Sequence, residues 1–217
     1  MIVKHLTCRN DESQLQAVCC LTAVAKHGTD AHRQILVDQG ALYAFGVLLA
    51  HRREAIRKEA CTCLASLCRS HFHVIMALKL VPKMVQSSGG AYVGYTSSCC
   101  DFFDAAAPVT DDAGRRALAA FGAVAIITSD VRRCFDFCRE HNAHSMGIEI
   151  LDEHVRSRLP TLDSLLSAYA TSNERTPSVL SQSLREVLTD IAADSRAAEA
   201  SSMAATMLSK HFAAAKC

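Results

Sequence analysis

One pattern occurs twice in the first 87 residues and constrains the fold more than any other feature of the chain. A small residue is followed by large apolar residues four and seven positions later. The set recurs at an offset of 43 residues: Ala17, Leu21 and Val24, then Ala60, Leu64 and Leu67. These spacings place the side chains on one face of a helix. A period of this length is typical of helical repeats, so we expect repeats over about residues 11–87.

A third copy is indicated at Ala117, where Phe121 and Val124 take the two large positions. Its offset from Ala60 is 57 residues, which is longer than the first offset by 14 residues. This copy predicts a further repeat over about residues 111–158.

The surplus length coincides with a stretch rich in glycine and serine. It contains Gly89, Gly90 and Gly94, and such residues punctuate helices and favour loops. We therefore predict a loop insertion over about residues 88–110, with at most a short helical turn at Cys100–Ala106.

Apolar periodicity and capping residues predict a series of helices. In chain order they are Asp11–His27 with Asp11 or Ser13 near its N-cap, Ala31–Asp38, Ala41–Ala50, Glu54–Ser70, His71–Lys79, Val81–Gln86, a helix from Asp111 or Asp112 to Thr128, Val131–Glu140 capped by Ser129 or Asp130, and Ala143–Arg158. Pro160 is expected to interrupt the series, and further helices follow over about residues 161–214. Gly40 stands where a left-handed turn is expected between two helices, and Lys79 takes that place in the second copy.

These residues resemble armadillo repeats. Ala17, Leu21 and Val24 correspond to the third helix of a repeat, His32–Asp38 to a short first helix and Ala41–Ala50 to the second helix. The resemblance implies an all-α fold, a right-handed α-solenoid of armadillo-like three-helix repeats.

The same resemblance implies a single domain over residues 1–217 and a cellular setting. Within the family, Ala25–His27 followed by Val37–Leu42 is most similar to armadillo proteins of the ciliary axoneme. The expected location is therefore the cytoplasm, with the axoneme of a cilium or flagellum as the specific site.

Composition excludes several classes of protein. The chain has 217 residues, half of them apolar, and a net charge of +1, so nothing favours nucleic acid as a partner. It contains no uninterrupted apolar run of about 18 residues, so we predict no membrane span. The N-terminus lacks the features of a secretory signal. Most of the 11 cysteines occupy apolar helix positions, where a free thiol acts as a small hydrophobe, and this favours a reducing compartment.

Four potential metal ligands recur at short spacings, namely Cys134, Cys138, His141 and His144. Thiolate and imidazole are the ligands that zinc prefers. A metal- or thiol-dependent regulator that uses Cys134, Cys138 and His141 is therefore an alternative function. One face of one helix rarely supplies a closed tetrahedral shell, so we predict no metal and no cofactor.

Catalytic signatures are missing from the sequence. We find no nucleophile elbow, no phosphate-binding loop and no dinucleotide fingerprint. The chain is therefore predicted not to be an enzyme.

The armadillo resemblance implies a protein-binding module whose third helices line a concave groove. In that family a recurrent asparagine binds the backbone of an extended peptide. The matching positions here are Ala23, Ser66 and Ala123, so the asparagine ladder is missing. Small residues instead permit close approach of a partner's helix or bulky apolar groups.

Basic residues lie in the first halves of the expected third helices: Arg57, Lys58, Arg115 and Arg116. They could favour an acidic partner such as a tubulin tail, although a simple solvated face is the alternative. The leading hypothesis is a non-enzymatic scaffold within a larger complex, with residues 88–110 as a second docking surface. A structural subunit of a ciliary or cytoskeletal assembly is its rival.

Overall fold

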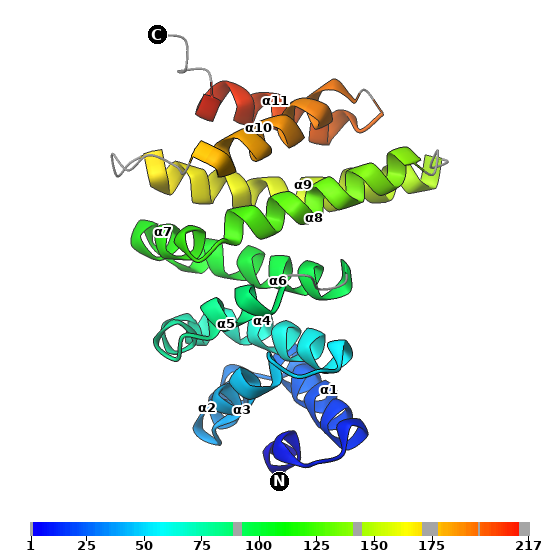
Figure 1. Ribbon diagram of the computed structural model, residues 1–217. Helices are drawn as coiled ribbons and strands as arrows, with labels where there is room; N and C mark the ends of the chain where they lie inside the picture. The colour runs from blue at the N-terminus through cyan, green and yellow to red at the C-terminus, as the bar shows by residue number, and fades with distance from the viewer. Residues whose placement is uncertain (1, 89–92, 141–144, 171–177, 195, 213–217) are drawn as a thin grey trace. The chain divides into compact units, whose positions relative to one another are not determined.

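The computed structural model describes residues 2–88, 93–140, 145–170, 178–194 and 196–212. All regular secondary structure within these ranges is helical, as predicted (Figure 1). The chain divides into two compact units, an N-terminal unit of residues 1–111 and a C-terminal unit of residues 112–217. The single domain over residues 1–217 stays a prediction.

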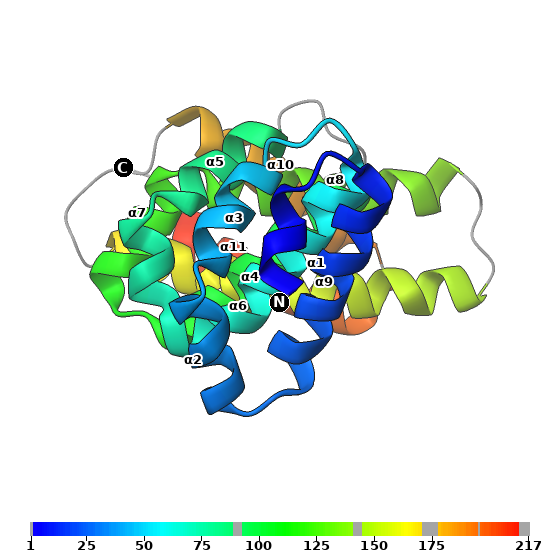
Figure 2. The same cartoon turned by 90° about the horizontal axis from the view of Figure 1, so that it is seen from below.

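The N-terminal unit contains six α-helices and two short 3₁₀ helices in its described residues. In order these are η1 (Ile2–Thr7), α1 (Asp11–His27), α2 (Asp30–Asp38), α3 (Ala41–Leu48), α4 (Glu54–Ala77), α5 (Leu80–Ser88), α6 (Val93–Ala106) and η2 (Ala107–Val109). Helices α1, α4 and α6 form one layer, because α4 packs against both of the others (Figures 1 and 2). Helices α2, α3 and α5 also pack against neighbours within this unit.

Local capping explains where the first two helices begin. The side chain of Asn10 accepts hydrogen bonds from the backbone N–H groups of Glu12 and Ser13, so Asn10 caps α1 one residue before the predicted position. Thr29 caps α2 through a reciprocal pair of hydrogen bonds with His32. Both caps satisfy backbone donors that a helix N-terminus leaves unpaired.

Gly40 and Lys79 occupy the two turns between a first and a second helix, as predicted. Gly40 precedes α3 with φ 80°, and Lys79 precedes α5 with φ 54°. Lys79 is the one described residue other than glycine with positive φ. The turn is therefore present in the second copy as well, although positive φ is energetically unfavourable for a lysine.

Helix α4 is longer than predicted. It runs through Ser70 and continues to Ala77, with a kink at His71, whose φ of −131° and ψ of 21° are not helical. The kink falls at the predicted boundary between two helices. His71 is buried, and its ring nitrogens contact the Ser70 hydroxyl at 2.8 Å and the Gln34 side-chain oxygen at 3.1 Å. These contacts fix the bend against α2.

The predicted loop insertion over residues 88–110 is wrong, because most of this segment is helix α6. Its inner face is fully buried, and the burial pattern of α4 recurs on it at an offset of 39 residues: Ile56, Ala60, Leu64 and Leu67 correspond to Tyr95, Cys99, Phe103 and Ala106. Helix α6 is therefore the next third helix. Cys99, Phe103 and Ala106 take the places of Ala60, Leu64 and Leu67, so the order of small and large residues differs from that of the first two copies.

The third copy predicted at Ala117 is consequently wrong. Ala117 lies in α7 (Asp112–Ala120), Gly122 turns the chain with φ 102°, and Val124 lies in α8 (Ala123–Glu140). Phe121 stands in the break with 38% of its surface exposed. Helix α8 also continues without interruption past the predicted caps at Ser129 and Asp130.

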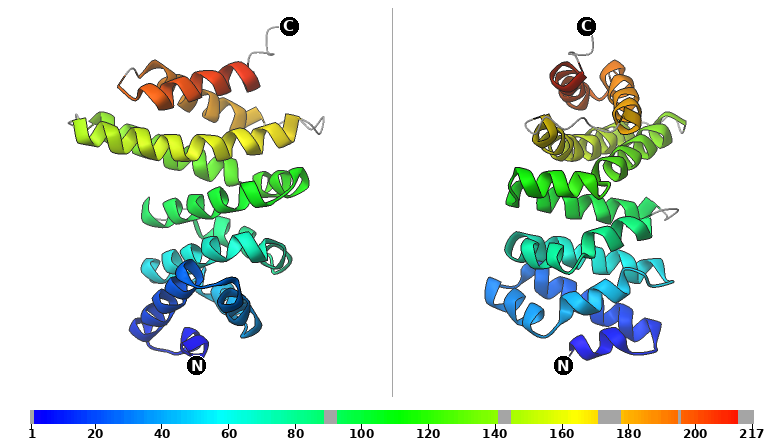
Figure 3. Two further views of the ribbon diagram at one scale, coloured as in Figure 1. Left: turned by 180° about the vertical axis from the view of Figure 1, so that it is seen from behind. Right: turned by 60° about the vertical axis from the view of Figure 1, so that its left-hand side comes forward.

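The C-terminal unit consists of five helices in its described residues: α7, α8, α9 (Ser145–Ala170), α10 (Ser178–Ala193) and α11 (Ala198–Phe212). Helix α9 packs against α7, α8 and α11, and α10 packs against α8 and α11 (Figure 3). Pro160 lies inside α9 and does not end it, which corrects the predicted interruption. Its ring is exposed.

A buried ionic cluster joins α8 to α9 in this unit. Asp130 is 3% exposed, and its carboxylate lies 3.0 Å from His154 Nε2 and 3.7 Å from Arg158 Nε. A buried carboxylate needs such partners because its desolvation is costly.

Replacing Gly40 with Val should destabilise the chain by about 1–3 kcal/mol, because a β-branched residue resists positive φ. No heavy atom lies within 4 Å of the position that a Cβ would take, so the cost is conformational and not a clash. Lys79→Gly is the matched variant and should be neutral or stabilising. Urea unfolding of both variants measures the pair, and equal effects would contradict the turn assignment.

Leu64→Ala should cost about 2–5 kcal/mol, because it removes transfer free energy and leaves a cavity. Leu64 is fully buried between helices, whereas Ile35 on α2 is 55% exposed. Ile35→Ala should therefore stay within about 0.5 kcal/mol of the parent chain. A cost for Leu64→Ala as small as that of Ile35→Ala in thermal unfolding would overturn the proposed core.

Candidate functional site

Equivalent positions on α1, α4 and α6 point away from the buried side of their layer. They are related by the offsets of 43 and 39 residues and are exposed or half-buried: Cys19, Thr62 and Asp101 in one row, and Ala23, Ser66 and Ala105 in the next. We call this surface the third-helix face. Short side chains dominate it, so a partner can approach the helices closely.

The hydroxyl groups on the third-helix face are directed to their own helix. Thr62 Oγ1 donates to the carbonyl of Lys58 at 3.1 Å, and Ser66 Oγ donates to the carbonyl of Thr62 at 3.0 Å. Burial first, and then the charge of Glu59, raises the pKa of the Cys19 thiol. The face therefore presents mainly small side chains, together with the exposed carboxylate of Asp101 on α6, and no row of amides.

Exposed cations extend the face along α1 and α4. Lys26 and Arg69 occupy equivalent positions three residues after Ala23 and Ser66, and both are exposed. Lys58, one turn before Thr62 on α4, is also exposed. Lys26 and Arg69 are not among the binding residues predicted from the sequence, although the offset of 43 residues relates them and could have revealed them.

Arg57, predicted to bind a partner, has a structural role. Its Nη1 donates to the carbonyls of His51 at 2.7 Å and Arg52 at 3.1 Å, and its guanidinium lies 5.4 Å from the centre of the Tyr95 ring. These contacts hold the segment between α3 and α4 against α6. Lys58 is therefore the predicted basic residue of this pair that remains available to a partner.

The other three predicted binding residues lie in the C-terminal unit, outside any third-helix row of the N-terminal unit. Arg115 pairs with Asp112 at 2.6 Å, and Arg116 Nη1 donates to the Ala168 carbonyl at 3.4 Å, both from α7. Ala123 begins α8 and is fully buried. The prediction that Ala123 lines an open groove is therefore wrong, because the third-helix copy was assigned to the wrong segment.

The alternative metal or thiol site receives no further support. Cys134 and Cys138 lie one turn apart on α8, while His141 and His144 lie outside the described residues. Burial, followed by Cys138 and Asp130, raises the pKa of the Cys134 thiol to about 11, which disfavours a reactive thiolate. Across the described ranges, no group of three or more His, Cys, Asp or Glu side chains is arranged to hold a metal ion.

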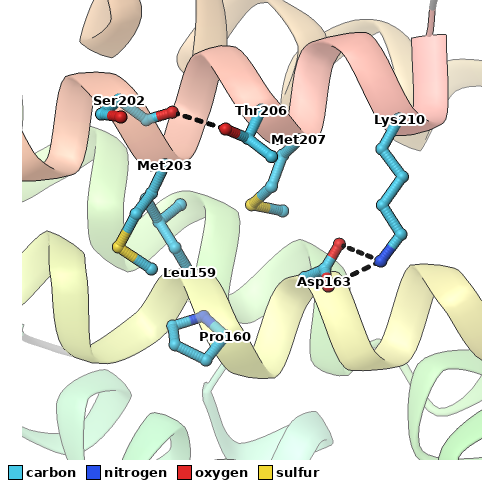
Figure 4. Close-up of a pocket in the computed structure, with 8 residues that line it drawn as sticks. All are labelled: Leu159, Pro160, Asp163, Ser202, Met203, Thr206, Met207 and Lys210. Atoms are coloured by element: carbon cyan, nitrogen blue, oxygen red, sulfur yellow. Dashed lines mark hydrogen bonds and ion pairs between the residues drawn. The ribbon is translucent and has the colours of Figure 1, made fainter.

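A pocket of about 340 Å³ lies between α9 and α11 in the C-terminal unit (Figure 4). Its apolar part comes from both helices: Leu159 and Pro160 on one side, Met203 and Met207 on the other. Thr206 donates to the Ser202 carbonyl at 2.9 Å, so that hydroxyl is satisfied within α11. The hollow is thus mainly apolar.

Ion pairs also connect α9 and α11, and the Asp163–Lys210 pair lines the pocket. Arg156 pairs with Glu199, and Asp163 accepts from Lys210 Nζ at 2.8 Å and lies 2.7 Å from His211 Nε2. Burial opposes ionisation of Asp163, but its bonds from Lys210 and His211 prevail and lower its pKa. Both pairs connect α9 to α11.

Comparisons with known proteins agree with this geometry. Residues 29–69 match the family model described as armadillo/β-catenin-like repeat, and this span covers α2, α3 and the first part of α4. An engineered protein from the Northeast Structural Genomics Consortium superposes with a TM-score of 0.61 at 15% identity, covering 96% of this chain and 97% of that chain. The chain has the fold of armadillo-repeat solenoids.

Two designed armadillo repeat proteins are also similar to this chain in fold. One has a TM-score of 0.57 at 14% identity and covers 95% of this chain and 98% of that chain. The other, solved in complex with the peptide (KR)4, has a TM-score of 0.57 at 16% identity and covers 97% and 91%. No curated protein sequence matches the chain significantly. The predicted armadillo-like fold class is confirmed, while the axonemal subtype stays a prediction.

None of the described helices is, by itself, both long and apolar enough to cross a bilayer. The bent pair α4 and α5, which meet at 95°, reaches that length and composition only when taken together.

Asp163→Asn should destabilise the C-terminal unit by less than about 1 kcal/mol near neutral pH, because the ion pair is partly exposed and screened. The pKa of Asp163 is lower in the folded chain than its ordinary value. Its stabilisation is therefore present above that ordinary value and is lost as pH falls through the folded value. Urea unfolding from pH 7 to pH 3 should show the difference between variant and parent shrinking below about pH 4.

Ser202→Ala, at the same pocket, is the control and should shift stability by no more than about 0.5 kcal/mol across that range. A difference between Asp163→Asn and the parent chain that grows as the pH falls would contradict the assigned sign.

Proposed function

We propose that this chain is a non-enzymatic protein-binding scaffold and that the third-helix face of the N-terminal unit is its binding surface. The main support is that small residues occupy equivalent positions on the three adjacent helices α1, α4 and α6. Exposed lysine and arginine side chains lie beside these positions on α1 and α4. An armadillo-type fold supports a binding role, since proteins of this fold bind peptides and other proteins.

The chemistry of the face favours shape and apolar contact over a ladder of hydrogen bonds to a peptide backbone. Ala23, Ser66 and Ala105 supply no side-chain amide, and the Ser66 hydroxyl is already bonded. A partner helix or a segment with bulky apolar groups can pack closely on such a surface. Affinity should then come mainly from buried apolar area at the centre of the contact.

Cations on α1 and α4 favour an acidic partner at that part of the face, while Asp101 places one carboxylate on α6. Lys26, Lys58 and Arg69 are exposed on α1 and α4. Such cations accelerate encounter with an acidic segment and disfavour a basic one. The similar designed protein was solved with the basic peptide (KR)4. We infer the opposite preference here, and a tubulin tail has the required charge.

We further propose that the chain acts in the cytoplasm as part of a ciliary or other cytoskeletal assembly, as a scaffold or as a structural subunit. The support is the similarity of Ala25–His27 and Val37–Leu42 to axonemal armadillo proteins. Imaging of the tagged chain in ciliated cells tests this setting. Exclusion of the chain from both cilium and cytoskeleton would remove it.

Ser66→Trp should block close packing on the third-helix face, and Ala23→Trp should do the same from α1. Ala31 on α2 is a small exposed residue outside the layer of α1, α4 and α6, so Ala31→Trp is the matched control. Fluorescence anisotropy with a glutamate-rich peptide bearing apolar residues at every fourth position measures binding. Both face variants should weaken binding by about tenfold or more, equivalent to about 1.4 kcal/mol.

Lys58→Glu/Arg69→Glu separates the charge contribution from the steric one. It should slow association and reduce the salt dependence of binding without changing the melting temperature. If the Trp variants fold and bind as tightly as Ala31→Trp, the third-helix face is not the binding surface.

A further inference from the structure

Three sulfur atoms from three helices meet in the core of the N-terminal unit. Cys61 Sγ on α4 lies 3.0 Å from Met84 Sδ on α5 and 4.0 Å from Cys99 Sγ on α6. Each of these residues is at most 1% exposed. We propose that Cys61, Met84 and Cys99 form a binding site for a soft monovalent metal ion, Cu(I). This site is independent of the third-helix face.

The spacing of the two thiols suits one shared ion. Sulfurs bound at about 2.3 Å in a planar three-coordinate arrangement lie about 4.0 Å apart. Cys61 and Cys99 already have this separation. Met84 Sδ would move away from Cys61 Sγ by roughly 1 Å, and methionine can do so because its side chain has three rotatable bonds.

The ligand types select the metal. Two cysteines and one methionine form a soft set, and thioether sulfur favours Cu(I). Zinc instead takes four ligands in a structural site, usually cysteine and histidine. Neighbouring oxygens are already used within the protein: the Cys61 thiol donates to the Ser98 carbonyl at 3.1 Å, and the Tyr95 hydroxyl donates to the Met84 carbonyl at 3.2 Å. Cu(I) is therefore the ion that fits best.

Binding must displace the thiol protons. Burial first, and then the neighbouring Cys99, raises the pKa of Cys61 well above its ordinary value, which favours its protonated thiol. One Cu(I) bound by two thiolates carries one net negative charge and releases two protons.

Purely structural packing would produce the same three contacts, since a buried thiol behaves as a small hydrophobe. A matched cysteine separates the two roles. Cys68 is on the same helix as Cys61, is equally buried and does not belong to the cluster. If replacement of Cys61 abolishes Cu(I) binding and replacement of Cys68 does not, the binding belongs to this cluster and is not a general property of buried thiols.

The test uses the full reduced chain carrying Cys19→Ser/Cys20→Ser, which removes two exposed thiols. The chain is refolded anaerobically with Cu(I), because the cluster has no exposed surface, and is then titrated with a chromophoric Cu(I) chelator. One tightly held ion per chain is expected, with three sulfur neighbours in X-ray absorption spectra. Bound Cu(I) should also raise the melting temperature, because the ion binds the folded state.

Cys61→Ala/Cys99→Ala should lose the ion, and Cys68→Ala should keep it. Met84→Leu preserves core volume and should weaken Cu(I) binding by about tenfold or more while leaving the fold intact. Zn(II) should not compete. The proposal is overturned if Met84→Leu and Cys68→Ala retain equal Cu(I) affinity, or if the chain refolded anaerobically with Cu(I) holds no tightly bound ion.

Discussion

Packing of α4 between α1 and α6 is the constraint on which the N-terminal unit depends. Ile56, Leu64 and Leu67 are fully buried on α4, and burying each such side chain contributes about 1.5–3 kcal/mol. A polar contact adds to this seam, because Thr22 Oγ1 on α1 lies 3.3 Å from the Glu59 carbonyl on α4. Once this stripe is buried, the opposite side of each helix must face outward, and the third-helix face is the result.

Much of this layer could be predicted from the sequence, because its first two members share small and leucine-like residues at fixed spacing. The left-handed turn at Gly40 was also predictable, since few residues other than glycine adopt positive φ. Helix α6 could not be recognised by the same pattern. Its core positions hold Cys99 and Phe103 in place of alanine and leucine, and its offset is 39 residues instead of 43. Glycines before it also suggested a loop.

That one error spread to the candidate site. The alanine-rich segment at Ala117 has the residue spacing expected of a third helix and was assigned as the third copy in place of α6. Ala123 was therefore predicted to line a groove, although it is buried at the start of α8. Ala23 and Ser66 do lie on the third-helix face, and their role in binding stays a prediction. The spacing of apolar residues within one helix therefore predicted which side of that helix is buried. Which helices of different repeats are equivalent could not be predicted without knowing which helices pack together.

Residues 93–106 form a packed helix that is equivalent to α4, with Tyr95, Cys99 and Phe103 fully buried. Native-state hydrogen exchange, resolved by residue, tests it most directly, because amides in a packed helix exchange only through local or global opening. We predict slow exchange from Cys99 to Ala106, comparable with that from Leu64 to Cys68. Exchange of this part of α6 at the rate of an unprotected loop, while α4 stays protected, would contradict the account.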